Sequence, residues 1–208
     1  MDGMPARSDH YLSGPIPWPN FALSCAMLYD MDQSSNALLA YAAGPSHLME
    51  ENSMKGNEKV LELLNEVLAD ELTAISQYMV HSEMCAAWGY GKLHGMVEKR
   101  AITEMKHAEE LIGRILFLEG QPIVSNLNKM HIGADVEKQL QNDRGAEFGA
   151  IKAYNAGTKL AADQGDYGTH QLLNSILKDE EAHIDEIEEQ LDLIAQMGLQ
   201  NYLAQQIA

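Results

Sequence analysis

The chain has 208 residues, 46% of them hydrophobic, and carries 31 Asp and Glu against 14 Lys and Arg, a formal net charge of −17. This acidic balance disfavours a nucleic-acid-binding surface, which needs basic residues to neutralise phosphates, and indicates cations as ligands. No run approaches the ~20 apolar residues of a membrane span, and two cysteines cannot build a disulfide framework or a four-thiolate metal site, so we expect a reducing, cytoplasmic compartment.

Residues 1–53 differ in composition from the rest of the chain. Five of the six prolines lie there, together with Ser, Gly and Asn and without a sustained hydrophobic period. This composition is typical of a loose extension. Glu50 and Glu51 can be encoded by a purine-rich, ribosome-binding tract just ahead of Met54. We therefore expect residues 1–53 to be either a disordered extension or sequence upstream of a native start at Met54.

From Met54 onward, apolar residues recur at three- and four-residue steps and predict four long amphipathic helices and a short fifth. In chain order, the expected helices cover about Asn57–Ala87, Lys92–Leu118, Asp135–Gln164, Thr169–Met197 and Leu199–Ile207. Asp135 is expected to cap the third helix, and Gly165 and Gly168 to bracket the turn into the fourth.

The lengths of the connections predict the topology. Short turns make the first and second helices antiparallel neighbours, and likewise the third and fourth, whereas the segment Glu119–Ala134 is long enough to cross the bundle. An all-α bundle of four helices with one long crossover, here with a short C-terminal fifth helix, is the arrangement of ferritin-like folds.

Acidic residues interrupt the apolar faces of all four long helices. The first and third helices contribute one Glu each, and the second and fourth contribute one Glu-x-x-His motif each, whose Glu and His can aim at one point. In chain order these residues are Glu71, Glu104, His107, Glu147, Glu180 and His183. Buried carboxylates are costly unless they are paired or bind cations, and a mixed set of carboxylates and imidazoles suits iron or manganese.

The two halves of this set are spaced alike. Glu71 precedes the Glu and His of the second helix by 33 and 36 residues, and Glu147 precedes those of the fourth helix by the same intervals. A tyrosine follows each of these two acids by seven residues, at Tyr78 and Tyr154. A constant shift of 76 residues therefore relates the halves and predicts a pseudo-two-fold site between two similar helix pairs.

Chance is the alternative explanation, since a single Glu-x-x-His is unremarkable in a chain with 8 His, and a helical Glu is usually solvated. Chance does not explain matched spacing in both halves together with two further acids on apolar faces. One Glu from each of two helices and Glu-x-x-His from each of the other two form the dimetal site of ferritin-like carboxylate proteins. We therefore interpret the six residues as ligands of a dimetal centre.

Five stretches carry a more specific pattern. They are MKG at 54–56, EMKHA at 104–108, RILFLEG at 114–120, DEEAHID at 179–185 and MGLQNYL at 197–203. Through them, residues 54–208 resemble bacterioferritin, a haem-binding ferritin family whose members begin at Met-Lys-Gly. The resemblance implies iron storage and detoxification, with Fe(II) oxidised by O2 or H2O2 and kept as ferric mineral inside a shell of 24 subunits built from dimers. It also implies a ferredoxin-type electron donor for iron release.

The same resemblance implies roles for individual residues of a di-iron ferroxidase centre. Glu104 and Glu180 match the bridging carboxylates, Glu71 and Glu147 the terminal ones, and His107 and His183 the imidazole ligands. Tyr78 matches a tyrosine that can act as a local electron donor, and a packed core aromatic is the alternative interpretation.

Met105 matches the family's haem ligand. It lies about 100° around the helix from Glu104 and about 160° from His107, so it points away from the dimetal ligands. The resemblance implies haem b shared between two subunits, with Ile102 and Leu72 as walls of its pocket. A methionine that fills a subunit interface is the alternative.

One departure from the family concerns Lys99, Arg100 and Thr103, which stand where some relatives carry His or acids facing the cavity. We therefore expect no dedicated iron site at that point of the inner wall. Three other functions remain open at this stage. A rubrerythrin-like peroxidase usually needs a Cys-rich iron domain, a dimanganese catalase would use similar ligands, and a non-catalytic shell subunit would not need the complete ligand set.

Overall fold

The computed structural model describes residues 54–207, so the expectations for residues 1–53 lie outside the described part of the chain. The described residues form α1 (Glu58–Ala87), α2 (Gly91–Phe117), α3 (Val136–Asp163), α4 (Tyr167–Met197) and α5 (Leu199–Gln206). No strand occurs among them. The expected all-α architecture is confirmed, and every predicted helix end lies within two residues of the observed one.

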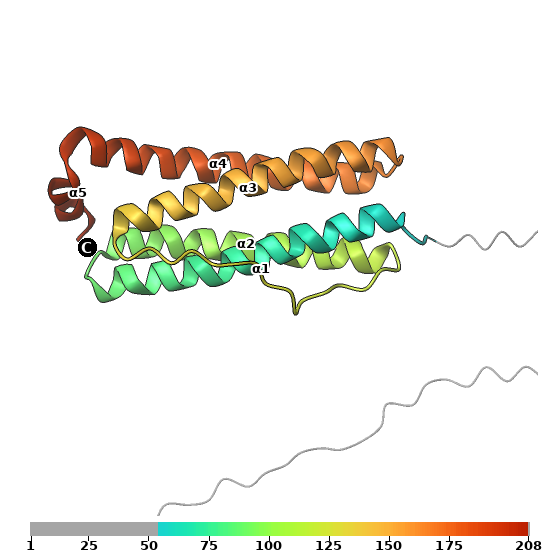
Figure 1. Cartoon of the computed structure of the whole chain (residues 1–208), viewed down its shortest axis with the longest axis horizontal. Coiled ribbons are helices and arrows are strands. Elements are labelled where there is room, and N and C mark those ends of the chain that lie inside the picture. The colour runs from blue at the N-terminus through green and yellow to red at the C-terminus, as the bar shows by residue number, and fades with distance from the viewer. Residues whose placement is uncertain (1–53, 208) are drawn as a thin grey trace, which may run out of the picture. The chain divides into compact units, whose positions relative to one another are not determined.

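The four long helices form two antiparallel pairs. α1 packs along α2 and α3 packs along α4, and the segment between α2 and α3 runs beside α1 from one end of the bundle to the other (Figure 1). α5 folds back against the ends of α4 and α2. The long crossover predicted from the connection lengths is therefore present. None of the described helices has the length and apolarity needed to cross a bilayer.

Side chains at the helix starts explain where α3 and α4 begin. Asp135 accepts a hydrogen bond from the Lys138 N–H at 2.8 Å, so the predicted N-cap of α3 is confirmed. The expectation that Gly168 lies in the turn before α4 is wrong, because Asp166 caps the helix and Gly168 belongs to its first turn. A Cβ atom at Gly168 would lie 2.8 Å from the Arg114 guanidinium, which explains the absence of a side chain there.

The apolar core consists of two main clusters at opposite ends of the bundle. The larger combines the first half of α1 with the second half of α2 and includes Leu64, Leu68 and Leu111. The other joins the far ends of α1 to α4 with α5. The six predicted ligand positions lie between these clusters on all four long helices. The bundle therefore places these carboxylate and imidazole side chains at mid-length.

Candidate metal centre

Four helices bring the six predicted ligands together at mid-bundle. The four carboxylates are Glu71, Glu104, Glu147 and Glu180, and none of them is more than 3% exposed. Among soluble proteins, acids this deeply buried are paired, protonated or bound to cations.

One group of possible ligand atoms gathers around His107. Its Nδ1 lies 3.0 Å from Glu104 Oε2, 3.0 Å from Glu180 Oε1 and 3.8 Å from Glu71 Oε2. One ligand atom from each of these four residues lies within 4.8 Å of every other, so the group could hold a metal ion.

A second group gathers around His183. Its Nδ1 lies 3.0 Å from Glu104 Oε1, 3.5 Å from Glu180 Oε2 and 3.7 Å from Glu147 Oε2, again close enough to hold one ion. Glu104 and Glu180 belong to both groups and turn one oxygen to each imidazole. Two cation positions therefore share two carboxylates, and each has one further Glu and one His of its own.

The terminal carboxylates are held by tyrosines of the opposite helix pair. Tyr78 on α1 donates a hydrogen bond to Glu147 on α3, and Tyr154 on α3 donates one to Glu71 on α1. Both rings are fully buried. These two reciprocal bonds show that the pseudo-two-fold relation predicted from the 76-residue shift extends beyond the six ligand positions.

Several polar atoms of the cluster lack hydrogen-bond partners. His183 Nδ1 and Glu104 Oε1 approach to 3.0 Å without hydrogen-bond geometry, and Glu180 Oε1 is also unsatisfied. Buried polar atoms are rarely left in this way, because each unsatisfied group costs free energy. A pair of cations between the carboxylates and imidazoles would satisfy them.

Burial and mutual repulsion also shift the pKa values of the cluster. Burial raises the pKa of Glu71 to about 8 and that of Glu147 to about 7, with repulsion from Glu180 adding to each. Burial disfavours protonation of the imidazoles, yet the surrounding carboxylates raise the pKa of His183 to about 11 and that of His107 well above its usual range. The metal-free cluster therefore holds protons that an incoming cation must displace.

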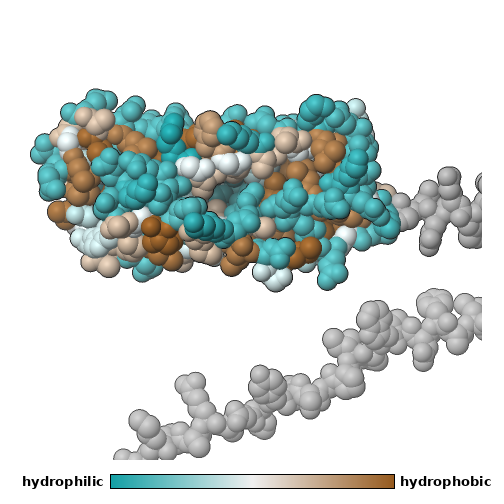
Figure 2. All heavy atoms as spheres, in the orientation of Figure 1, coloured by the Kyte–Doolittle hydropathy of each residue, from teal (hydrophilic) through white to brown (hydrophobic). Residues whose placement is uncertain are grey.

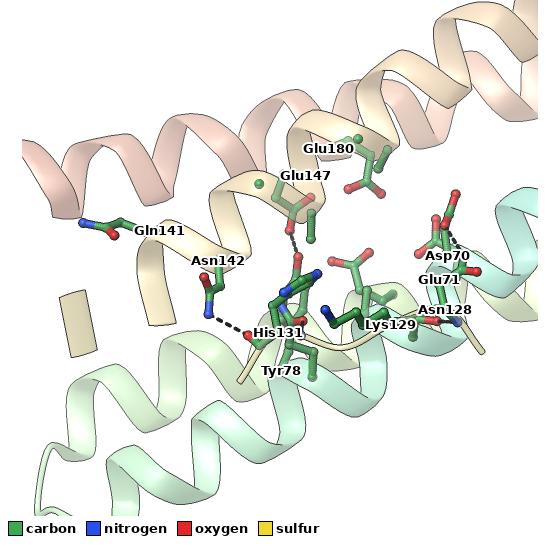
Figure 3. A pocket seen from close by; sticks show the side chains of 18 residues that line it. Asp70, Glu71, Tyr78, Asn128, Lys129, His131, Gln141, Asn142, Glu147 and Glu180 are labelled. Atoms are coloured by element: carbon green, nitrogen blue, oxygen red, sulfur yellow. Dashed lines mark hydrogen bonds between the residues drawn. The ribbon is translucent and has the colours of Figure 1, made fainter. Parts of the chain in front are cut away.

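A cavity of about 480 Å³ connects the surface with this cluster. Figure 3 shows Glu71, Glu147 and Glu180 among the side chains that line it, together with Asn128 and Lys129 of the crossover. Helices α1 and α3 form its sides, so a small ion or oxidant can reach the carboxylates from the side of the crossover.

Polar side chains of α1 fix the crossover over this cavity. Backbone N–H groups of Asn128, His131 and Gly133 donate to Thr73 Oγ1, Gln77 Oε1 and His81 Nε2 at 2.7, 2.7 and 3.0 Å. Because His81 Nε2 accepts, its Nδ1 is the protonated nitrogen of the neutral ring, and it lies 2.8 Å from Asp143 Oδ1. No motif in the sequence indicated this network, because the hydrogen-bond partners of an irregular segment depend on tertiary contacts.

Two further charged residues lie next to the centre, Asp179 beside the His107 imidazole and Arg100 beside the Tyr78 ring. Asp179 Oδ2 lies 3.3 Å from His107 Nε2, which orients the ring so that Nδ1 faces the cluster. Arg100 is 2% exposed, and its Cζ lies 5.8 Å from the centroid of the Tyr78 ring. The grouping of Arg100 with Lys99 and Thr103 suggested that it faces the inner cavity of the shell. Its burial shows instead that it lies inside the helical bundle. Its position four residues before Glu104, on the same helix face, was the available signal.

The predicted haem residues lie on a different face. Met105 is 54% exposed and Ile102 is 44% exposed, whereas Leu72 is partly buried against the apolar core. Apolar patches interrupt the mostly hydrophilic surface of the bundle in Figure 2 as well. The thioether of Met105 is thus directed away from the candidate metal centre, as helix geometry predicts.

The comparisons with known proteins agree with this arrangement. The Ferritin-like domain family matches residues 61–197. Bacterioferritin of Brucella melitensis biotype 1 is 40% identical over 149 residues, which cover 72% of this chain and 92% of that protein. The chain belongs to the bacterioferritin family. Other members include Bacterioferritin of Rhodobacter capsulatus, 40% identical over 72% of this chain and 92% of the relative. Bacterioferritin BfrA of Mycobacterium tuberculosis is 38% identical over 73% of this chain and 96% of its own length.

Proposed function

We propose that this protein is an iron-storage ferroxidase, which oxidises Fe(II) at the centre formed by the six side chains and keeps the product as ferric mineral within a shell of 24 copies. The observation that carries the proposal is the pair of four-residue groups around His107 and His183 with Glu104 and Glu180 in common. This donor set matches the di-iron carboxylate sites of ferritin-like bundles. Membership of the bacterioferritin family supports the same function.

The roles of the ligands follow from their chemistry. Carboxylate oxygens are hard donors that stabilise Fe(III) over Fe(II), and they lower the barrier to oxidation of the bound substrate ions. Glu104 and Glu180 hold the two Fe(II) ions close together, so that each can supply one electron to the same O2 or H2O2 molecule. Glu71 and Glu147 complete one position each, and binding displaces the protons that these buried acids hold.

Charge and access support the capture of Fe(II). The chain has a formal net charge of −17, and a negative field raises the local concentration of cations around a protein. The cavity below the crossover then leads to the carboxylates, and Asp70, which accepts a hydrogen bond from Asn128, also lines it (Figure 3).

Aerobic oxidation of Fe(II) by the purified protein, followed by electron microscopy, tests this function. We expect rapid oxidation and mineral-filled shells from the unmodified chain and from Glu110→Ala, which removes an exposed acid of α2. Glu104→Ala is expected to lose the rapid phase. A chain that oxidises no Fe(II) but disproportionates H2O2 when loaded with manganese would instead be a dimanganese catalase.

We further propose that one haem b lies between two subunits with Met105 of each as an axial ligand and Ile102 and Leu72 beside it. The exposed thioether on an apolar part of α2 fits such a group, since a haem pocket needs a soft donor within apolar surroundings. When bound, the haem would carry electrons, taken from a ferredoxin-type donor, for the release of stored iron. A cytoplasmic location suits the free, buried thiol of Cys85.

A further inference from the structure

The pseudo-two-fold relation can be used to compare the surroundings of the two cation positions. Under the 76-residue shift, the ligands of one half coincide in type with those of the other. The residues next to these ligands differ in type between the two halves. Arg100 corresponds to Ile176, and Asp179 corresponds to Thr103. Each position has therefore acquired a charged neighbour that the other lacks, and the two charges have opposite signs.

Arg100 places a positive charge behind the Glu147–His183 position. Its guanidinium faces the Tyr78 ring, and the hydroxyl of that ring donates to Glu147 at 2.5 Å. Burial opposes the charge, but attraction to Glu147 is the first of the interactions that raise the pKa of Arg100. The ion-pair partner at 2.7 Å is Glu186, whose side chain is 45% exposed and hence partly screened by water.

Other features of Arg100 show that this charge is not fully neutralised. Its Nε and Nη1 have no hydrogen-bond partner among the described residues. Asp143, one turn before Glu147, contacts the Gln77 amide at 2.9 Å and His81 Nδ1 at 2.8 Å, both through Oδ1. Among the described residues, the ion pair of Arg100 is with Glu186 and not with Asp143. Ile176, the counterpart of Arg100 in the other half, is 1% exposed and belongs to the apolar cluster that also contains Tyr154.

Asp179 has the opposite effect on the Glu71–His107 position. Its carboxylate is 55% exposed and lies 3.3 Å from His107 Nε2, where it orients the ring with Nδ1 towards the cluster. Nδ1 can then bind a cation once the proton held there is displaced. The corresponding residue behind His183 is Thr103, whose hydroxyl donates to the Lys99 carbonyl instead. The positive charge of Arg100 near Glu147–His183 and the orientation of the His107 ring by Asp179 therefore both favour cation binding at the Glu71–His107 position.

We propose that the two positions of the centre are unequal, and that the Glu71–His107 position binds a divalent cation first because Arg100 weakens the Glu147–His183 position and Asp179 strengthens its counterpart. This inference rests on the proposed function, since it requires the six residues to bind two cations. It assigns Arg100 and Asp179 as positioning residues that set the order of loading.

Anaerobic titration with Co(II), followed by its visible absorption, measures the two affinities. Crystals loaded with one Co(II) per subunit then locate the first ion by anomalous scattering. In the unmodified protein we expect two resolved steps and higher occupancy at Glu71–His107. Arg100→Met is expected to strengthen the second step roughly tenfold, the scale of one partly screened unit charge at an effective dielectric constant near 20. Asp179→Asn is expected to weaken the first step by roughly tenfold.

Two surface variants serve as controls. Arg144→Met removes the same charge from an ion pair with α4, but the pair to Glu188 is about half exposed on both sides, so we expect both steps to stay unchanged. Asp185→Asn removes an exposed acid of α4 with the same expectation. Arg100→Lys keeps the charge and is expected to keep the order of loading, even if Arg100→Met proves too unstable to purify.

Equal occupancy of both positions in the unmodified protein, or first occupancy at Glu147–His183, would overturn the inference. So would an Arg100→Met variant that folds and leaves the second affinity unchanged. If the unmodified protein bound no more Co(II) than the Glu104→Ala variant, the proposed centre itself would be refuted, and the inference with it. These outcomes separate failure of the loading order from failure of the function.

Discussion

The hydroxyl of Tyr78 on α1 donates a hydrogen bond to Glu147 on α3 across 2.5 Å, between the two helix pairs that the long crossover connects. Its pseudo-symmetric counterpart, from Tyr154 to Glu71, runs in the reverse direction between the same two helices. Each terminal carboxylate is therefore held by a residue of the other half of the chain. The geometry of the centre thus depends on how α1 and α3 pack, as well as on the Glu-x-x-His motifs of α2 and α4.

Removal of one of these hydroxyls tests their contribution. Tyr78→Phe and Tyr154→Phe keep the buried ring but leave a buried carboxyl group without its donor, a loss of roughly 1–3 kcal/mol for a buried acceptor left unsatisfied. We expect a lower thermal midpoint for the metal-free variants and a smaller loss with Zn(II) bound, because the ion compensates the carboxylate. Differential scanning calorimetry with and without Zn(II) measures both.

Tyr167→Phe is the matched control for these variants, since that ring is 68% exposed. It is expected to leave the thermal midpoint unchanged in both conditions. If the Tyr78→Phe and Tyr154→Phe variants were as stable as Tyr167→Phe in both states, the hydroxyls would not contribute to holding the carboxylates.

The ligands themselves are tested by Glu104→Ala and His183→Ala. Glu104→Ala removes a buried charge, and the raised pKa values of Glu71 and Glu147 limit the negative charge that His183→Ala leaves behind. We therefore expect a folded, assembled bundle from both variants. Stopped-flow absorbance is expected to show initial Fe(II) oxidation close to the uncatalysed rate in both variants, with circular dichroism unchanged. Unaltered initial rates would contradict the assignment of the ligands.

Much of this arrangement was predictable, because the signals are local. Helical periodicity fixed the elements, and the spacing of Glu71, Glu104 and His107 against their counterparts indicated the centre before its geometry was known. The start of α4 was misjudged because Gly168 avoids a collision with Arg114, a contact between helices distant in sequence. Arg100 was misplaced for a related reason, since an arginine beside exposed residues usually lies at the surface and only packing against Tyr78 reveals its burial.

The raised pKa values predict a pH dependence of cation binding. Burial raises the pKa of Glu71 to about 8 and that of Glu147 to about 7 in the metal-free cluster, so both hold protons below these values. A cation needs the deprotonated forms, and its affinity is therefore expected to fall as the pH is lowered from 8 to 6. Calorimetry with Zn(II) in buffers of different ionisation enthalpy is expected to show proton release near pH 6.5 that diminishes towards pH 9. Equal proton release at both pH values would contradict this account.

The N-cap of α4 predicts a pH dependence of stability with a defined sign. Burial alone would raise the pKa of Asp166, but hydrogen bonds from Thr169 and the charge of Arg114 outweigh burial and lower it. A carboxylate with a depressed pKa stabilises the folded state above its unfolded pKa, and the contribution is lost as the pH falls through the folded value. Asp166→Asn keeps a capping side chain and is expected to lower the thermal midpoint by about 2–4 °C at pH 7, the effect of about 1 kcal/mol. The deficit is expected to shrink as the pH is lowered from 5 towards 3.

Asp163→Asn provides the comparison for this cap. Asp163 pairs with Lys159 at 2.6 Å, but both side chains are more than half exposed, and such pairs contribute little. Its thermal midpoint is expected to match that of the unmodified chain at both pH values. A deficit in Asp166→Asn that persists unchanged at low pH would show that the charge of the carboxylate is not what stabilises the helix start.

The haem proposal can be separated from the di-iron centre because its ligand points in another direction. Met105 is 54% exposed on α2, whereas Glu104, next to it in sequence, is 1% exposed within the cluster. Met105→Leu roughly conserves volume and is expected to cost less than about 1.5 kcal/mol, so assembly is expected to survive. If the two Met105 thioethers of a subunit pair hold one haem, the purified variant loses the haem absorbance, while stopped-flow Fe(II) oxidation continues at the unmodified rate. Met197→Leu, at the end of α4, is expected to retain both. Full haem content in Met105→Leu would show that a different residue binds the haem iron.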